Sequence, residues 1–206
     1  WRSHNNMGWY ALKNGDLKQA QNHFEAAIEF KNANPIVLTN LAVVADRQGH
    51  TILAKQWHDK AVRTNKYTSI ALENRAEHLL QQGQFKAALD DLKSAKPMTM
   101  RHHWVHIHTA QALVGLGDWK EAAREFLRAK SIDPSATEAY VKQVAGLFWT
   151  SDSQAKAGLQ FFKAIEQQWD GRWWVHANMA RLAAKTGDAE LAELQTDIAT
   201  ALRASP

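Results

Sequence analysis

The residues best suited to chemistry are four histidines in one stretch, His102, His103, His106 and His108, which read HHWVHIH with their neighbours. His102 and His106 are four residues apart, and neutral imidazoles at that spacing on a helix can chelate zinc or nickel. The stretch contains no Asp, Glu or Cys, so a packed or solvated set of histidines is the better interpretation. We therefore expect no metal and no other cofactor.

No other motif indicates catalysis. The chain has no phosphate-binding glycine loop, no HExxH motif and no nucleophile elbow. The absence of cysteine excludes disulfides and thiolate metal sites. The acidic pair Asp90 and Asp91 is predicted to lie solvated on an exposed helix face. The sequence thus predicts a protein that is not an enzyme.

Composition limits the classes of partner. Of the 206 residues, 45% are apolar and 22% are charged, which is ordinary for a globular protein. The net charge of +4 is too small to indicate nucleic acid, and no apolar run could insert directly into a membrane. The chain begins at Trp1 rather than Met, so we expect a fragment of a longer protein. Any targeting sequence would lie outside it, which leaves the cytoplasm and the periplasm both open.

The clearest structural element is the stretch 104–134, which contains two helical patterns separated by Gly117 and Asp118. Apolar or small residues recur in both patterns at the i, i+3, i+4 spacing of an amphipathic helix. Gly117 can adopt the left-handed conformation that ends the first helix, and Asp118 can cap the second. The stretch is therefore predicted to form one helix hairpin.

The same hairpin recurs six times. Its hinge residues follow one another at spacings of 34, 34, 34, 35 and 35: Gly15, Gly49, Gly83, Gly117, Asp152 and Gly187. Three further columns hold only Ala or Gly: Gly8, Ala42, Ala76, Ala110, Ala145 and Ala180; Ala20, Ala54, Ala88, Ala122, Ala157 and Ala192; Ala27, Ala61, Ala95, Ala129, Ala164 and Ala199. Small residues at fixed places let helices approach closely, so these columns predict helix contacts. Pro97 predicts an early end for the second helix of the third hairpin.

The 34-residue period, the Gly-Asp hinges and the stretch AREFLRAKSIDP resemble the tetratricopeptide repeat. The resemblance covers six repeats, at approximately 1–34, 35–68, 69–102, 103–136, 138–171 and 173–206. It is weakest in the fifth, whose hinge lacks the glycine. It implies an all-α fold, an α-α superhelix (solenoid) of six helix hairpins in a single domain over 1–206. In such a superhelix the first helices line a concave groove.

One column of the first helices is polar. It lies two residues before the first small marker, about 200° around the helix from it, and holds Asn6, Asn40, Asn74, His108, Gln143 and Asn178. A side-chain amide offers a donor and an acceptor that match the backbone of an extended peptide. The column resembles the asparagine ladder of superhelices that bind extended peptides. The alternative is that these residues bridge neighbouring repeats through hydrogen bonds or water.

Aromatic and basic residues accompany the ladder on the same face. The aromatic anchors are Trp9, Trp104, Trp149 and Trp174. Arg47 and Arg181 are the cations that we include in the site. Aromatic anchors flanked by amides are typical of a peptide groove. For Trp104 and Trp174, at the starts of helices, packing between repeats is an equal alternative.

The leading hypothesis is a non-enzymatic protein–protein interaction scaffold. It would bind an extended or helical segment of a protein or peptide partner through the Asn/Gln ladder and the Trp anchors. One alternative is an assembly platform of a larger complex, with homo-oligomerisation through the convex face or the array ends. Another is the substrate-recruiting arm of a multidomain enzyme. Repeat scaffolds serve many unrelated roles, so the fold does not choose among these.

Overall fold

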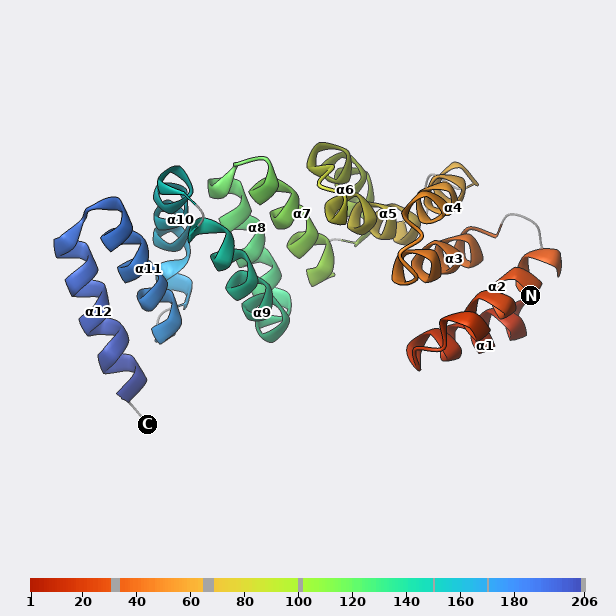
Figure 1. The fold of residues 1–206 in the computed structure, drawn as a ribbon, viewed down its shortest axis with the longest axis horizontal. Helices are drawn as coiled ribbons and strands as arrows, with labels where there is room; N and C mark the ends of the chain where they lie inside the picture. The colour runs from red at the N-terminus through yellow and green to blue at the C-terminus, as the bar shows by residue number, and fades with distance from the viewer. Residues whose placement is uncertain (31–33, 65–68, 100–101, 150, 170, 205–206) are drawn as a thin grey trace. The chain divides into compact units, whose positions relative to one another are not determined.

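The computed structural model describes residues 1–30, 34–64, 69–99, 102–149, 151–169 and 171–204. Within these ranges the chain forms twelve α-helices and two short 3-10 helices, and no strand (Figure 1). The contacts divide it into two compact units, Trp1–Met100 and Arg101–Pro206. None of the described helices is both long enough and apolar enough to cross a lipid bilayer. The predicted all-α fold is confirmed.

The first unit contains three helix hairpins. They are α1 (Arg2–Lys13) with α2 (Leu17–Phe30), α3 (Pro35–Arg47) with α4 (Thr51–Thr64), and α5 (Ser69–Gln81) with α6 (Phe85–Thr99). The two helices of each hairpin pack together, and α2 packs on α3 as α4 does on α5. The first helices α1, α3 and α5 also contact one another in succession. The unit is therefore a stack with the first helices on one side.

The second unit contains three more hairpins. They are α7 (His103–Gly115) with α8 (Trp119–Ile132), α9 (Pro134–Ala145) with α10 (Asp152–Ile165), and α11 (Trp173–Thr186) with α12 (Ala189–Ala204). Two 3-10 helices, η1 (Gly146–Trp149) and η2 (Glu166–Trp169), extend α9 and α10. Helix α9 packs on α7 and α8, and α10 packs on α8 and α11, whereas η1 packs on both α9 and α10. This unit is therefore also a stack, in which η1 rather than α9 packs against α10.

Five of the six hairpins turn at a glycine with positive φ, as predicted: Gly15, Gly49, Gly83, Gly117 and Gly187. After each of these glycines the next residue donates its N–H to the carbonyl five residues back. Asp118 N, for example, lies 2.9 Å from Leu113 O. This bond belongs to the Schellman motif, which satisfies carbonyls left free at a helix end. The Asp118 side chain then caps α8 by accepting from the N–H of Glu121 at 3.2 Å.

The fifth hairpin corrects the predicted register. Asp152 is not a hinge residue but the first residue of α10, which Ser151 caps. The predicted contact residues Ala157 and Ala164 are half-buried and exposed, whereas Gly158 and Ile165, one place later, are buried. Without a left-handed glycine, the chain leaves α9 through the 3-10 helix η1. Because η1 lengthens the connection between α9 and α10, the residues buried on α10 lie one place later in the sequence than the repeat pattern predicts.

The prediction from Pro97 was wrong. Helix α6 continues through this residue to Thr99. Proline fixes φ near a helical value and removes one backbone N–H. Because Pro97 lies in the last turn of α6, that loss interrupts one hydrogen bond and leaves the rest of the helix intact.

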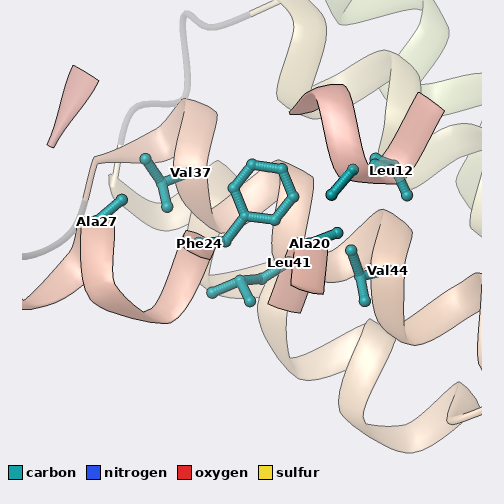
Figure 2. Packing of buried hydrophobic residues seen from close by; sticks show 8 residues of the cluster. Leu12, Ala20, Phe24, Ala27, Val37, Leu41 and Val44 are labelled. Carbon is teal, nitrogen blue, oxygen red and sulfur yellow. The ribbon is translucent and has the colours of Figure 1, made fainter. Parts of the chain in front are cut away.

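The core of the first unit forms around Phe24, which is fully buried. Its ring lies among Ala20, Val37 and Leu41, where α2 meets α3 (Figure 2). A Cβ on Gly8 of α1 would come within 2.6 Å of this ring. Glycine at the first small column thus gives the ring its space, as the repeat pattern predicts.

In the second unit the equivalent space is filled by several aromatic rings. Phe126, Phe148, Phe161 and Phe162 are all fully buried. The Phe126 and Phe161 centroids lie 5.9 Å apart edge to face, and those of Phe161 and Phe162 lie 5.4 Å apart in the same manner. Such pairs stabilise a core beyond the area that they bury. This cluster spans α8, η1 and α10 and fixes the irregular fifth hairpin.

Candidate peptide-binding site

In the first unit the polar column lies on three successive first helices. Asn6 is exposed on α1, and Asn40 and Asn74 are half-buried on α3 and α5. The Asn40 Nδ2 donates to Asn5 Oδ1 of the preceding hairpin at 2.9 Å. The Asn74 Nδ2 donates to Ile70 O, one turn back in its own helix, at 2.8 Å. The first contact bridges two repeats, whereas the second orients the amide without bridging.

In the second unit the column continues with His108 on α7, Gln143 on α9 and Asn178 on α11. Gln143 is exposed, and the other two are half-buried. The Asn178 Nδ2 donates to Trp174 O at 2.7 Å, the same geometry as in Asn74. Within the described residues, the Oδ1 atoms of Asn74 and Asn178 accept no hydrogen bond. Asn74 and Asn178, one in each unit, therefore each combine a fixed amide with an unpaired side-chain acceptor.

His108 is held neutral at this site. Burial lowers its pKa from 6.5 to about 4, because a charged imidazole loses hydration that nothing nearby replaces. The ring centroid of Trp104 lies 6.1 Å away. The Nδ1 atom is buried without a hydrogen-bond partner in the described part of the chain. A neutral imidazole has one donor and one acceptor, so His108 can replace an amide chemically.

Three of the four predicted tryptophan anchors are accessible. Trp9 is 53% exposed, Trp104 43% and Trp149 37%. Trp174 is only 6% exposed, and its Nε1 donates to Glu138 Oε1 of α9 at 2.9 Å. Trp174 therefore packs between the last two hairpins. Of the four predicted anchors, Trp9, Trp104 and Trp149 are the exposed ones.

Basic side chains lie over two of these rings. The Lys13 ammonium is 5.4 Å from the Trp9 centroid, and the Arg181 guanidinium is 3.8 Å from that of Trp149. Lys185 donates to Trp149 O at 2.8 Å. These cation–π contacts join an aromatic surface to positive charge. Each unit thus has an exposed predicted anchor with a positive charge over its ring.

Arg47 has a structural contact as well as an exposed position. Its Nη1 donates to Leu12 O at 3.2 Å, in the last turn of α1. The Leu12 carbonyl also accepts from the N–H of Gly15 at 3.2 Å, so Arg47 adds a second donor to it, and a cation at this helix end also complements the helix dipole. Arg47 thus links the first two hairpins, and its remaining N–H groups could still reach a ligand.

The histidine stretch is divided between two faces. His106 is buried against the paired helix α8, with its Nδ1 2.6 Å from Glu125 Oε2. His102 is exposed at the start of α7. His106, four residues later, is therefore turned inward and already paired with Glu125.

The prediction for the acidic pair was half wrong, because Asp91 is not solvated. It is 7% exposed, and both of its oxygens accept from Arg75 at 2.7 Å. Arg75 also donates to Asp59 at 3.1 Å. Although burial raises the pKa of Asp59, the neighbouring Lys55 and Arg75 hold it below its ordinary value. The network joins α4, α5 and α6 and contributes to stability.

Sequence reasoning missed a second polar cluster, formed by Asp46, His58 and His78. The Asp46 carboxylate bonds to both imidazoles, Oδ2 to His58 Nε2 at 2.9 Å and Oδ1 to His78 Nδ1 at 2.7 Å. Partial burial raises the pKa of Asp46, but the two histidine contacts outweigh it and hold the pKa below its ordinary value. A signal was present, since His58 stands in the column that holds Phe24 and Phe126 in other hairpins.

Comparison with known proteins agrees with the helix-hairpin architecture. Models described as tetratricopeptide repeat match four segments, 2–34, 70–90, 103–128 and 173–193. Anaphase-promoting complex subunit 3 of Schizosaccharomyces pombe is 23% identical over 141 residues, which are 68% of this chain and 21% of that protein. The chain thus spans about a fifth of the length of this relative.

Solved structures with the same fold cover nearly the whole chain. PilF of Pseudomonas aeruginosa has a TM-score of 0.67 at 17% identity, and the match covers 99% of this chain and 92% of that one. MamA from Desulfovibrio magneticus RS-1 has a TM-score of 0.62 at 13% identity, with 98% and 94% covered. At these identities the similarity shows the fold alone.

Proposed function

Because the chain belongs to the tetratricopeptide repeat family, whose fold supports protein–protein interaction, we propose that it is a non-enzymatic scaffold for an extended or helical segment of a protein partner. The observation that carries the proposal is the amide column beside exposed tryptophans on the first helices. Such a surface offers hydrogen bonds and apolar area together, which is what a peptide ligand requires.

The amides suit a ligand backbone rather than particular side chains. In Asn74 and Asn178 the bond from Nδ2 to the helix carbonyl fixes the side chain and leaves Oδ1 as an acceptor. A backbone N–H of the partner can donate to it. Packed helices lie about 8–10 Å apart and an extended chain rises about 3.3 Å per residue. Successive rungs within a unit would therefore meet a ligand about every third residue.

The tryptophans and their cations provide the selectivity. Trp9 with Lys13, and Trp149 with Arg181, present an aromatic face beside a positive charge. Apolar side chains of a partner pack on such rings, and carboxylates approach the cations. The preferred partner is thus a segment that combines apolar and acidic residues.

The triple substitution Asn40→Ala, Asn74→Ala and Asn178→Ala should weaken a bound peptide. A peptide selected from a displayed library would be titrated calorimetrically against each protein. Each lost hydrogen bond costs about 1 kcal/mol, so the dissociation constant should rise at least about tenfold if two rungs bind. Circular dichroism should show the same helix content, because all three changes favour the helix.

Asn22 is the matched control, since it is an exposed asparagine on the second helix α2. Asn22→Ala should leave the dissociation constant unchanged. Equal affinity of the triple variant and the unmodified chain would refute the ladder.

A second candidate function is an assembly platform. The relative in Schizosaccharomyces pombe is named as a subunit of a complex. In addition, Met7 and Tyr10 of α1 are 51% and 64% exposed beside a depression of about 500 Å³. Light scattering separates the two functions. The scaffold proposal predicts a monomer at every concentration, whereas a dimer that Met7→Ser and Tyr10→Ser disperse would favour assembly.

A further inference from the structure

Two imidazoles and one carboxylate converge between three consecutive helices of the first unit. These helices are α3, α4 and α5, labelled in Figure 1. Their nearest ligand atoms, one each from Asp46, His58 and His78, all lie within 4.8 Å of one another. The His58 and His78 side chains are 1% and 2% exposed, and that of Asp46 is 19% exposed. The cluster is therefore enclosed on the imidazole side and open to solvent on the carboxylate side.

We propose that Asp46, His58 and His78 bind a transition-metal ion, and that Zn²⁺ fits the donor set best. Two imidazole nitrogens and one carboxylate oxygen are the ligands that zinc takes in three-ligand sites. The open side of Asp46 leaves the fourth position to water. Hard cations such as Mg²⁺ prefer all-oxygen sites, so the two nitrogens select against them.

Coordination requires the three side chains to adjust. Ligand atoms about 2.0–2.1 Å from a tetrahedral zinc are about 3.3 Å from one another. Different oxygens of the carboxylate now lie 2.9 Å from His58 Nε2 and 2.7 Å from His78 Nδ1, and one ligand atom from each residue lies within 4.8 Å of the other two. The carboxylate would move away from the imidazoles by a few tenths of an ångström, and any ligand atoms now farther apart than about 3.3 Å would move closer by about 1.5 Å at most. The contacts that now hold the side chains together keep them close to the coordinating arrangement.

His58 and His78 stand at places where other hairpins have apolar residues. His58 occupies a column filled by Phe24, Leu92 and Phe126 in other hairpins. His78 occupies one that holds the buried Val44, Ala112 and Leu182 and the exposed Tyr10. Burying an imidazole costs more than burying a leucine. Two such replacements that meet at one carboxylate need a joint explanation, and a shared ligand supplies one.

One atom limits the affinity. To coordinate through Nε2, His58 must carry its hydrogen on Nδ1, and that atom is buried without a partner among the described residues. An unpaired buried donor weakens binding by about one to two powers of ten. We therefore expect a micromolar site rather than the tight site of a zinc finger. Metal that binds the folded chain alone also raises the melting temperature.

The test is a calorimetric titration of the full chain, prepared without a histidine tag, with Zn²⁺. We expect one ion per chain and a higher melting temperature in its presence. Asp46→Asn, His58→Gln and His78→Gln should each weaken binding at least about tenfold. His102→Gln is the matched control, because it breaks the other His pair suggested by the sequence, and it should bind like the unmodified chain.

Co²⁺ gives a readout that does not depend on the variants folding. On the unmodified chain it should give the strong visible absorption of a tetrahedral site. It should also broaden the magnetic resonance signals of His58 and His78 before those of His102. Absence of saturable binding, broadening centred on His102, or binding that survives all three substitutions would overturn the proposal.

Discussion

Replacing Arg75 with Met should lower the free energy of unfolding by about 3 kcal/mol, as expected when one member of a buried ion pair is removed. The Arg75 side chain is 23% exposed and that of Asp91 is 10% exposed, and the pair makes two 2.7 Å hydrogen bonds. Without Arg75 the Asp91 carboxylate stays buried and uncompensated. Chemical denaturation followed by circular dichroism measures the loss.

Two further variants identify the cause. Arg75→Met combined with Asp91→Leu should recover most of the lost stability, because no buried charge then remains without a partner. Arg124→Met is the surface control. Its pair with Glu121 has side chains 58% and 35% exposed and should contribute less than about 1 kcal/mol. Equal losses for Arg75→Met and Arg124→Met would contradict the assigned role of the buried pair.

Gly158→Ala should destabilise the second unit by about 2 kcal/mol through overpacking. The added Cβ would lie 2.5 Å from Phe148 Cγ and 2.6 Å from Phe148 Cβ. These atoms belong to the rigid part of a side chain that is fully buried among aromatic rings. The backbone of α10 or η1 must therefore move, and this cost exceeds the gain of about 1 kcal/mol in helix propensity.

Gly146→Ala is a matched control in the same hairpin. A Cβ there meets nothing within 4 Å, and its φ of −61° suits alanine. The change should leave stability equal or raise it by up to about 1 kcal/mol. Thermal unfolding of both variants gives the comparison. A neutral Gly158→Ala would mean that Phe148 is packed less tightly than described.

The sequence predicted those parts of the fold that depend on local chemistry. The glycine hinges and the Asp118 cap each act within one turn, and the small columns follow the helical period, so spacing alone identifies them. It failed in the fifth hairpin, where Asp152 starts a helix instead of forming a hinge. In that hairpin the register depends on how η1 packs against α10. The spacing of residues along one helix carries no information about that packing.

The polar contacts between helices were less predictable. Periodicity shows which face of a helix is turned inward, but not which residue stands opposite it. Asp91 was therefore assigned to solvent although Arg75 of the facing helix binds it. For the same reason, the sequence does not predict that His58 and His78 both contact Asp46, because these contacts depend on how the hairpins stack.

In the candidate site, the sequence predicted the helix face of the amide column but not the hydrogen bonds of its members. The contacts between neighbouring helices also decide which predicted tryptophan anchors are exposed. Trp174 lies four residues before Asn178, just as Trp104 lies four residues before His108, yet Glu138 and the neighbouring rings cover Trp174. The adjacent repeat decides whether a tryptophan at the start of a helix is exposed. The residue pattern of that helix alone therefore cannot distinguish an anchor for a partner from a tryptophan that packs between repeats.

The proposed role of the amide column is to bind a peptide backbone. The most direct measurement is a double-substitution cycle on a selected peptide, in which one backbone amide at a time is replaced by an ester that lacks the N–H. At contact positions the ester should weaken binding to the unmodified chain about tenfold. It should have little effect on the variant with Ala in place of Asn40, Asn74 and Asn178. An ester penalty of the same size for both proteins would contradict the account.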